Sequence, residues 1–172
     1  MRKITMIVGF LSLSAVLASP LAAHGGAEAG GTVFEQIMSH YEAIHASLAG
    51  DTIEGVAEHA GEIQRIARET ASSFSAGTAG VATGDGKECQ SLLPEVEGSA
   101  KTLVSATTLE NARLAFAELS RPLVRYREMV SGERPNVVFC SMAKKPWLQD
   151  SDVITNPYYG SKMLRCGDIV SN

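Results

Sequence analysis

The sequence has few aromatic residues, only three cysteines and no long apolar run after its N-terminus. Aromatic residues make up 6% of the 172 residues. The sequence contains no G-x-S-x-G, no H-E-x-x-H and no glycine loop of the kind that cradles phosphates. It has no basic stripe, and 19 acidic residues outnumber 15 Lys and Arg residues. These absences argue against nucleic-acid binding and leave catalysis without a visible site, so we expect no enzymatic activity.

The N-terminal run has the order of a secretory signal peptide. Arg2 and Lys3 precede a largely apolar stretch over residues 4–17, and small residues follow up to Ala23. A membrane-spanning helix needs about 20 apolar residues, which is more than this run supplies. We expect cleavage after Ala23, or alternatively after Ala18. No cysteine lies near the cleavage site, so we expect a periplasmic or secreted protein without a lipid anchor.

Removal of residues 1–23 would leave one domain of ordinary size. The remaining 149 residues carry 19 acidic and 13 basic side chains, which gives a net charge of -6. This length is sufficient to bury a core. We expect residues 24–32 to be a disordered leader and residues 33–172 to form a single domain, with a C-terminal cap over residues 137–170.

Four segments repeat the spacing of an amphipathic helix, with apolar residues at intervals of three and four. We predict helices over residues 33–49, 52–74, 91–106 and 108–131. Pro122 falls inside the last apolar stripe without breaking its phase, so we expect one kinked helix there. Because most connections are short, the predicted fold class is mainly α, an up-and-down four-helix bundle with a small β/loop cap.

One connection, residues 75–90, is long and rich in Gly, Ala, Ser and Thr. It shows no hydrophobic periodicity, which is typical of a flexible loop. Cys89 lies at its end. We therefore predict that Cys89 is a separate thiol with no soft partner nearby.

The histidines give no strong metal motif. His40, His45 and His59 flank the apolar stripes, and no two of them stand at the i, i+4 spacing that shares one helical face. The paired Glu-x-x-His motifs of di-metal helical bundles are also missing. We expect three partly exposed helix histidines. His24 is a different case, because cleavage after Ala23 would give it a free amine beside its imidazole, a combination that chelates copper.

The chemistry of the sequence is concentrated in one stretch near the C-terminus, FCSMAKKPWLQDSDVITNPYYGSKMLRCG. Cys140-x-Met142 opens it, and Met163-x-x-Cys166 closes it. Residues 137–142 are β-prone, and residues two apart in a strand share a face, so Cys140 and Met142 should point the same way.

A turn should return the chain to that first sulfur pair. The run Asn-Pro-Tyr-Tyr-Gly over residues 156–160 has turn chemistry. We expect it to bring Met163 and Cys166 back, with a last short strand over residues 168–170. Trp147, Tyr158 and Tyr159 would seal the cap.

Two interpretations of the four sulfur residues stay open. Thiolates and thioethers are soft donors that select Cu(I), Ag(I) or related ions, so a convergent S4 set would bind such a metal. Alternatively, Cys140 and Cys166 pair in an oxidising compartment and the methionines fill gaps. That disulfide would close a loop with 25 residues between the cysteines, stabilising the fold by roughly 3 kcal/mol. Spacing alone slightly favours the disulfide.

The terminal pattern resembles a known signature. F-C-S-M-A, then W-L, then N-P-Y-Y-G-x-x-M-L-x-C-G is similar to an uncharacterised bacterial exported domain, a domain-of-unknown-function family. That domain also occurs fused to periplasmic adaptor subunits of heavy-metal (copper and silver) efflux systems. The resemblance covers residues 33–170, including A-R-L-A-F-A-E-L-S-R-P-L. The matching positions are Cys140, Met142, Trp147, Asn156, Pro157, Tyr158, Gly160, Met163, Cys166 and Gly167.

One departure concerns Ser141, where the family usually has proline, so the local backbone here is less rigid. The resemblance implies heavy-metal handling outside the inner membrane. We therefore expect an accessory protein that binds Cu(I) or another thiophilic ion for sequestration or handover to an efflux system. Its ligands would be Cys140, Met142, Met163 and Cys166, and its partner a periplasmic adaptor. The alternative is a structural or interaction module of the envelope with a Cys140–Cys166 disulfide.

Overall fold

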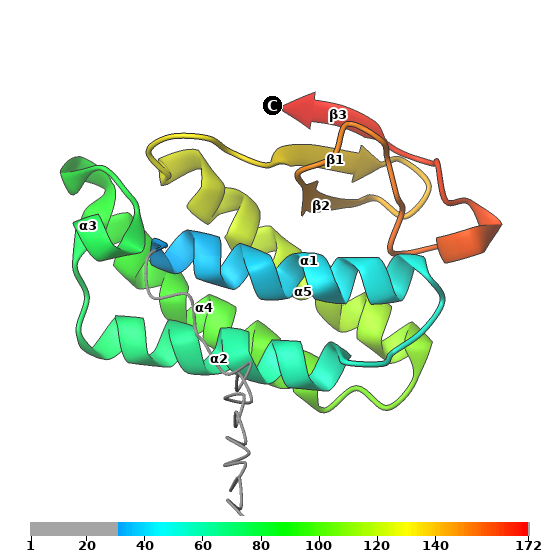
Figure 1. Cartoon of the computed structure of the whole chain (residues 1–172), viewed down its shortest axis with the longest axis horizontal. Coiled ribbons are helices and arrows are strands. Elements are labelled where there is room, and N and C mark those ends of the chain that lie inside the picture. Colours follow the sequence, from blue (N-terminus) through cyan, green and yellow to red (C-terminus); the bar gives the residue numbers. More distant parts are fainter. Residues whose placement is uncertain (1–30, 172) are drawn as a thin grey trace, which may run out of the picture.

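The computed structural model describes residues 31–171, so the predicted signal peptide and nearly all of the predicted leader lie outside the described residues. The chain is mainly helical, and a small three-stranded antiparallel sheet follows the helices near the C-terminus (Figure 1). In the part that is described, no helix combines the length and apolar character needed to cross a membrane.

Four long helices occupy the segments in which they were predicted. They are α1 (Val33–Ala49), α2 (Val56–Ser72), α4 (Gly86–Val104) and α5 (Leu109–Met129). Helix α1 begins where Thr32 and Glu35 form a capping box, which satisfies backbone N–H groups that have no partner within the helix. Helix α5 continues through Pro122, as its unbroken apolar phase predicted.

The prediction of a flexible loop over residues 75–90 is wrong. This segment contains the short helix α3 (Ala76–Ala79), the 3-10 helix η1 (Thr83–Asp85) and the first turn of α4. The Tyr126 hydroxyl donates to the carbonyl of Ala79 at 2.7 Å and so fixes α3 to α5. Because each element is about one turn long, small residues pack here without producing a helical period in the sequence.

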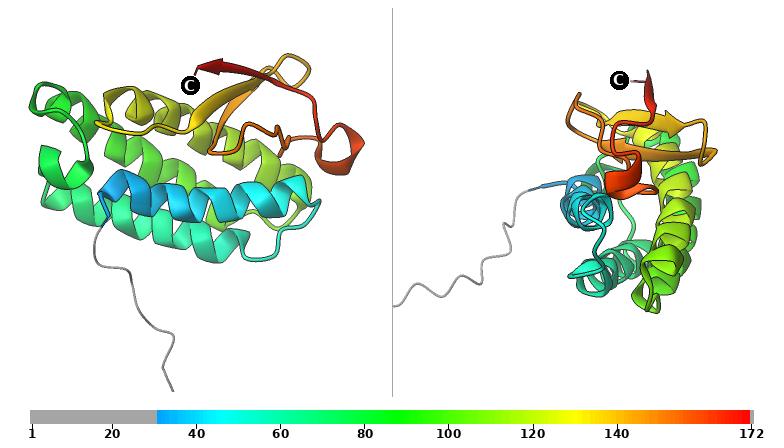
Figure 2. Two further views of the ribbon diagram at one scale, coloured as in Figure 1. Left: turned by 45° about the horizontal axis from the view of Figure 1, so that its top comes forward. Right: turned by 90° about the vertical axis from the view of Figure 1, so that its right-hand side faces the viewer.

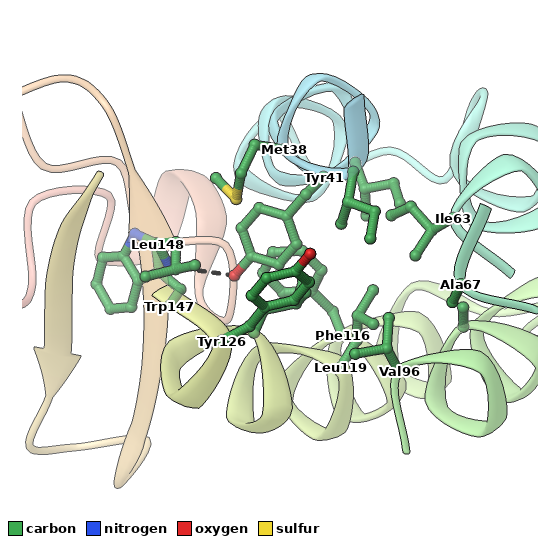
Figure 3. Packing of buried hydrophobic residues seen from close by; sticks show 14 of the residues in the cluster. Met38, Tyr41, Ile63, Ala67, Val96, Phe116, Leu119, Tyr126, Trp147 and Leu148 are labelled. Carbon is green, nitrogen blue, oxygen red and sulfur yellow. Dashed lines mark hydrogen bonds between the residues drawn. The ribbon is translucent and has the colours of Figure 1, made fainter. Parts of the chain in front are cut away.

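The long helices pack in pairs, α1 against α2, α2 against α4, and α4 against α5 (Figure 2). Helix α1 also contacts α5. The apolar stripes meet in one continuous core, part of which is shown in Figure 3. Within it, Tyr41 stacks on Phe116 at a centroid distance of 4.6 Å, and Phe34 lies 5.0 Å from Tyr126. The stripes thus supplied both the helix positions and the buried faces.

The sheet has the strand order β2-β1-β3, with every neighbour antiparallel. Its strands are β1 (Asn136–Cys140), β2 (Lys145–Gln149) and β3 (Asp168–Ser171), and the 3-10 helix η2 (Gly160–Lys162) precedes β3. The last strand was predicted, whereas β2 was not. A four-residue turn with Lys144 in the left-handed region (φ 55°) joins β1 to β2.

Helix α1 covers the outer edge of β2. The backbone N–H of Leu148 donates to the Tyr41 hydroxyl at 3.2 Å (Figure 3), and two residues later that of Asp150 donates to Glu42 Oε1 at 3.1 Å. Tyr41 also shares a 2.7 Å hydrogen bond with Ser120 of α5. An edge strand otherwise leaves such N–H groups unpaired. These bonds therefore fix the sheet, and the motif it carries, on α1 and α5.

Candidate thiol site

The structure brings Cys140 and Cys166 together, with their sulfur atoms 3.3 Å apart. Cys140 ends β1, and Cys166 lies two residues before the start of β3. The two strands pair so that Phe139 faces Asp168, which places the two cysteines side by side at the same end of the ladder. Both are free thiols. Their proximity is what the metal interpretation and the disulfide interpretation both require.

Hydrogen-bond donors surround the sulfur of Cys140. Burial raises the pKa of this thiol, but hydrogen bonds to its sulfur lower the pKa by more, so the net shift is downward. The donors are the Ala143 N–H at 3.3 Å, the Cys166 thiol, the Asn156 side chain and the Met142 N–H. The pKa of Cys166 is raised, chiefly by its hydrogen bond to Cys140. The two thiols thus differ in role, because Cys140 ionises first and its thiolate accepts the S–H of Cys166.

The two methionines are placed differently from the prediction. Strand β1 ends at Cys140, and the chain turns at once, with the Lys144 N–H donating to the Cys140 carbonyl at 2.7 Å. Met142 therefore lies in the hairpin turn, 63% exposed, and shares no strand face with Cys140. Met163 follows η2 and is 36% exposed. The expectation that Cys140 and Met142 point the same way from a strand is wrong, because the strand ends two residues earlier than predicted.

Asn156 organises the turn that precedes Cys166. Its buried Oδ1 accepts the N–H groups of Tyr158 at 2.8 Å and Tyr159 at 3.1 Å, which confirms a turn at Asn-Pro-Tyr-Tyr-Gly. Its Nδ2 donates to the carbonyl of Cys166 at 2.6 Å. One side chain thus shapes the turn and fixes the backbone of a cysteine, which explains why the motif contains an asparagine at this position.

Trp147 and Tyr158 pack beside the thiols. Trp147 is fully buried in β2, its Nε1–H donates to Gln149 Oε1 at 2.9 Å, and Tyr158 meets it edge-on at 5.8 Å. Gly167 has φ 149°, and a Cβ there would lie 2.6 Å from the Trp147 ring. Glycine is therefore required directly after Cys166, both for the backbone angle and for the close approach of the indole.

Two residues outside the recognised motif tie it to the helices. Arg113 of α5 bonds Asp51 Oδ1 at 2.6 Å and the Leu48 carbonyl at 2.8 Å, while its Nε donates to the Pro157 carbonyl at 2.8 Å. Asp51 Oδ2 accepts the N–H of Ser161 at 2.9 Å. The sequence suggested Asp51 only as a cap of the second helix, but the N-cap of α2 is Gly55. Nothing in the sequence indicated that Asp51 or Arg113 contacts the turn region of the motif, which lies more than 40 positions away from both.

The remaining metal-ligand candidates lie apart from the thiol pair or bind other groups. Cys89 is fully buried in α4, where burial raises its pKa and Tyr126 contacts its sulfur. His45 is 4% exposed, and its Nε2–H donates to the Thr155 carbonyl at 2.6 Å, so its expected partial exposure is wrong. His24 lies outside the described residues. Among residues 31–171, no three His, Cys, Asp or Glu side chains are grouped to hold a metal ion.

The comparisons with known proteins add no relative: no family model matches this chain, nor does any curated protein or solved structure.

Proposed function

We propose that this protein is an exported, non-catalytic accessory protein that binds Cu(I) or Ag(I) through Cys140 and Cys166 for sequestration or handover. The observation that carries the proposal is the 3.3 Å approach of two thiols, one of them surrounded by hydrogen-bond donors that favour its thiolate. Thiolate is the form that binds metal and the softest ligand that proteins offer. The signal-like N-terminus and the resemblance of the C-terminal motif support the heavy-metal context.

The geometry of the thiol pair fits a shared ion with a small movement. Two thiolates bound to one tetrahedral ion at about 2.3 Å lie about 3.8 Å apart, so the Cys140 and Cys166 sulfurs need to separate by only about 0.5 Å. The Cys166 side chain has room for this movement, because it is only partly buried. A two-coordinate ion would require a wider opening.

The exposed methionines suit a transfer role. Met142 and Met163 lie at the surface on the two segments that carry the cysteines. Their thioethers are weaker and more exchangeable donors than the thiolates and would complete the coordination shell of the ion. Because they lie at the surface, they would also allow the ion to pass to a partner such as a periplasmic adaptor. The architecture that we propose for this module is an up-and-down four-helix bundle with the thiol pair in its cap, supported by the pairwise contacts of α1, α2, α4 and α5.

The second candidate function is a structural or interaction module of the envelope. It is favoured by the same sulfur approach, because closing the gap by about 1.3 Å would give a disulfide of normal length. In that case Trp147 and Tyr158 are packing around a cross-link, and the methionines are surface residues of an acidic binding module.

A competition titration against a Cu(I) chelator under reducing conditions separates the two candidates. We expect Cys140→Ser and Cys166→Ser each to abolish tight Cu(I) binding, and Cys89→Ala, the matched control thiol, to leave it unchanged. We expect Met142→Leu combined with Met163→Leu to lower Cu(I) affinity about tenfold, equivalent to roughly 1.4 kcal/mol. The leucines keep the apolar volume, so thermal stability of the metal-free protein should change little. If wild type binds Cu(I) only as weakly as the variant that carries both Cys140→Ser and Cys166→Ser, the structural module is the better description.

A further inference from the structure

A second pair of metal-ligand side chains lies between the first two helices. His40 of α1 and His59 of α2 face each other with their Nδ1 atoms 3.1 Å apart. Their rings are 5.4 Å apart between centroids and inclined at 44°. No sequence motif indicated this pair, because the residues are 19 positions apart and belong to different helices.

Helix packing explains how the pair is formed. His40 directly precedes Tyr41, and His59 directly precedes Ala60, and both Tyr41 and Ala60 are buried in the core. Each histidine therefore lies at the margin of its apolar stripe, where the neighbouring helix is close and solvent still has access. Both side chains are partly buried. The two rings thus lie where the helices meet and are neither fully buried nor fully exposed.

The facing nitrogens can hold one proton or one metal ion between them. If both rings were protonated, two cations would meet at 3.1 Å, which is unfavourable. Burial lowers the pKa of His40, and the neighbouring His59 lowers it further, while Glu62 opposes the shift. One hydrogen bond joins the two rings in the structure, so a metal ion that binds both nitrogens has to displace the proton between them.

The distance between the nitrogens matches two ligands of one ion. With metal–nitrogen bonds of about 2.0 to 2.1 Å, the ligating nitrogens of two imidazoles lie about 3.3 Å apart on a tetrahedral ion. At adjacent positions of a square-planar ion they lie about 2.9 Å apart. The observed 3.1 Å falls between these values. The nitrogens therefore already have the separation that chelation needs, but they face each other across a hydrogen bond, so the rings have to turn until both lone pairs meet at the ion.

Glu62 can become a third ligand only after its side chain turns away from Arg65, because in the present conformation of the described residues no three His, Cys, Asp or Glu side chains are grouped to hold a metal ion. It lies three residues after His59 on α2, so both side chains project from the same helix face. Its charge acts on His40, and a surface groove of about 440 Å³ is lined by His40 and Glu62 together. Arg65 now binds its carboxylate at 2.9 Å, and an incoming divalent ion would compete for that oxygen.

We propose that His40 and His59 form a site for a divalent transition-metal ion, with Glu62 as third ligand and Cu(II) bound more tightly than Zn(II). Imidazole and carboxylate suit these borderline ions, and the stability order of divalent ions places Cu(II) above Zn(II). The site is separate from the thiol pair in residues and in the ions it selects, and it does not depend on the proposed Cu(I) function.

The test uses the mature chain with Cys140→Ser, Cys166→Ser and His24→Ala, which removes the thiol pair and the candidate N-terminal chelate. Calorimetric titrations with Cu(II) and with Zn(II) measure affinity, and electron paramagnetic resonance of the Cu(II) form counts its nitrogen ligands. We expect two imidazole nitrogens. His40→Gln or His59→Gln should each weaken binding at least tenfold, and Glu62→Gln should weaken it severalfold.

Glu69→Gln is the matched control, because Glu69 also binds Arg65, at 2.7 Å, but lies about two turns beyond Glu62 along α2. It should leave both affinities unchanged. In case a histidine variant unfolds, NMR of the same background protein with its histidines intact provides a second measurement. Zn(II) should shift the ring protons of His40 and His59 and leave those of His45 in place. Unshifted rings, or affinities equal in the histidine variants and the parent, would overturn the proposal.

Discussion

Gly160 shows how a single residue determines whether the motif turn can dock on the helices. It has φ 54°, a left-handed conformation that side chains disfavour. A Cβ added there would collide with the Asp51 carboxylate and with the Arg113 guanidinium, so the ion pair could not keep its present place. Glycine is therefore required at the end of Asn-Pro-Tyr-Tyr-Gly for two reasons: the backbone is in the left-handed region, and the neighbouring side chains leave no room for a Cβ.

We therefore expect Gly160→Ala to lower the free energy of unfolding by about 1–3 kcal/mol, from backbone strain and displacement of the ion pair. Gly98→Ala is the matched control, since Gly98 lies within α4 and an added Cβ there contacts nothing within 4 Å. That change should stabilise the protein by about 0.5–1 kcal/mol. Urea denaturation measures both. Equal stability of Gly160→Ala and wild type would show that the turn does not depend on this glycine.

At the scale of elements, the contact between Asp51, Arg113 and Ser161 joins the end of α1, the first part of α5 and η2. Arg113 also bonds the backbone carbonyls of Leu48 and Pro157. Hydrogen bonds from Ser161, followed by those from Arg113, hold the pKa of the Asp51 carboxyl well below its usual range. A carboxylate with a depressed folded pKa stabilises the fold above its unfolded pKa, and this contribution is lost as the pH falls.

The expected consequence is a pH dependence that Asp51→Asn removes. Asparagine keeps the shape and tolerates the left-handed backbone at this position (φ 59°), and it removes the charge together with one of the two acceptor oxygens, so only the pH-dependent part of the difference reports the charge. Wild type should exceed the variant in urea midpoint at pH 6, and the difference should shrink as the pH falls below about 4, the unfolded pKa of aspartate.

The control for this titration is Glu118→Gln, which breaks the exposed pair with Arg121 on α5 at a similar distance of 2.6 Å. Exposed pairs of this kind contribute little, so its profile should follow wild type. A constant difference between wild type and Asp51→Asn from pH 6 to pH 2 would contradict the assigned role of the charge.

Across the whole molecule, periodic features were predictable from the sequence and features set by long-range packing were not. The apolar stripes located α1, α2, α4 and α5 because burial repeats every turn. Strand β2 was missed because Pro146 and the lysines at positions 144 and 145 are not typical of a strand. Its outer edge is stabilised instead by a long-range hydrogen bond from Leu148 to Tyr41 of α1. The thiol pair followed from the motif, whereas the meeting of His40 with His59 depends on how two helices pack, which neither helix alone encodes.

The last prediction concerns the redox state of the three thiols in the protein as the cell produces it. Cys89 is buried and its pKa is raised, so it should resist alkylation in the native protein, while Cys140 and Cys166 should react unless Cu(I) protects them. If the protein binds Cu(I) as proposed, mass spectrometry of protein taken from copper-supplemented cells, with its thiols trapped during denaturation, should count three free thiols, because a metal-bound pair stays reduced. The Cys89→Ala variant should give two. If one thiol is counted with and without copper, and it is Cys89, then Cys140 and Cys166 form a permanent disulfide and the stabilised envelope module replaces the copper-binding protein.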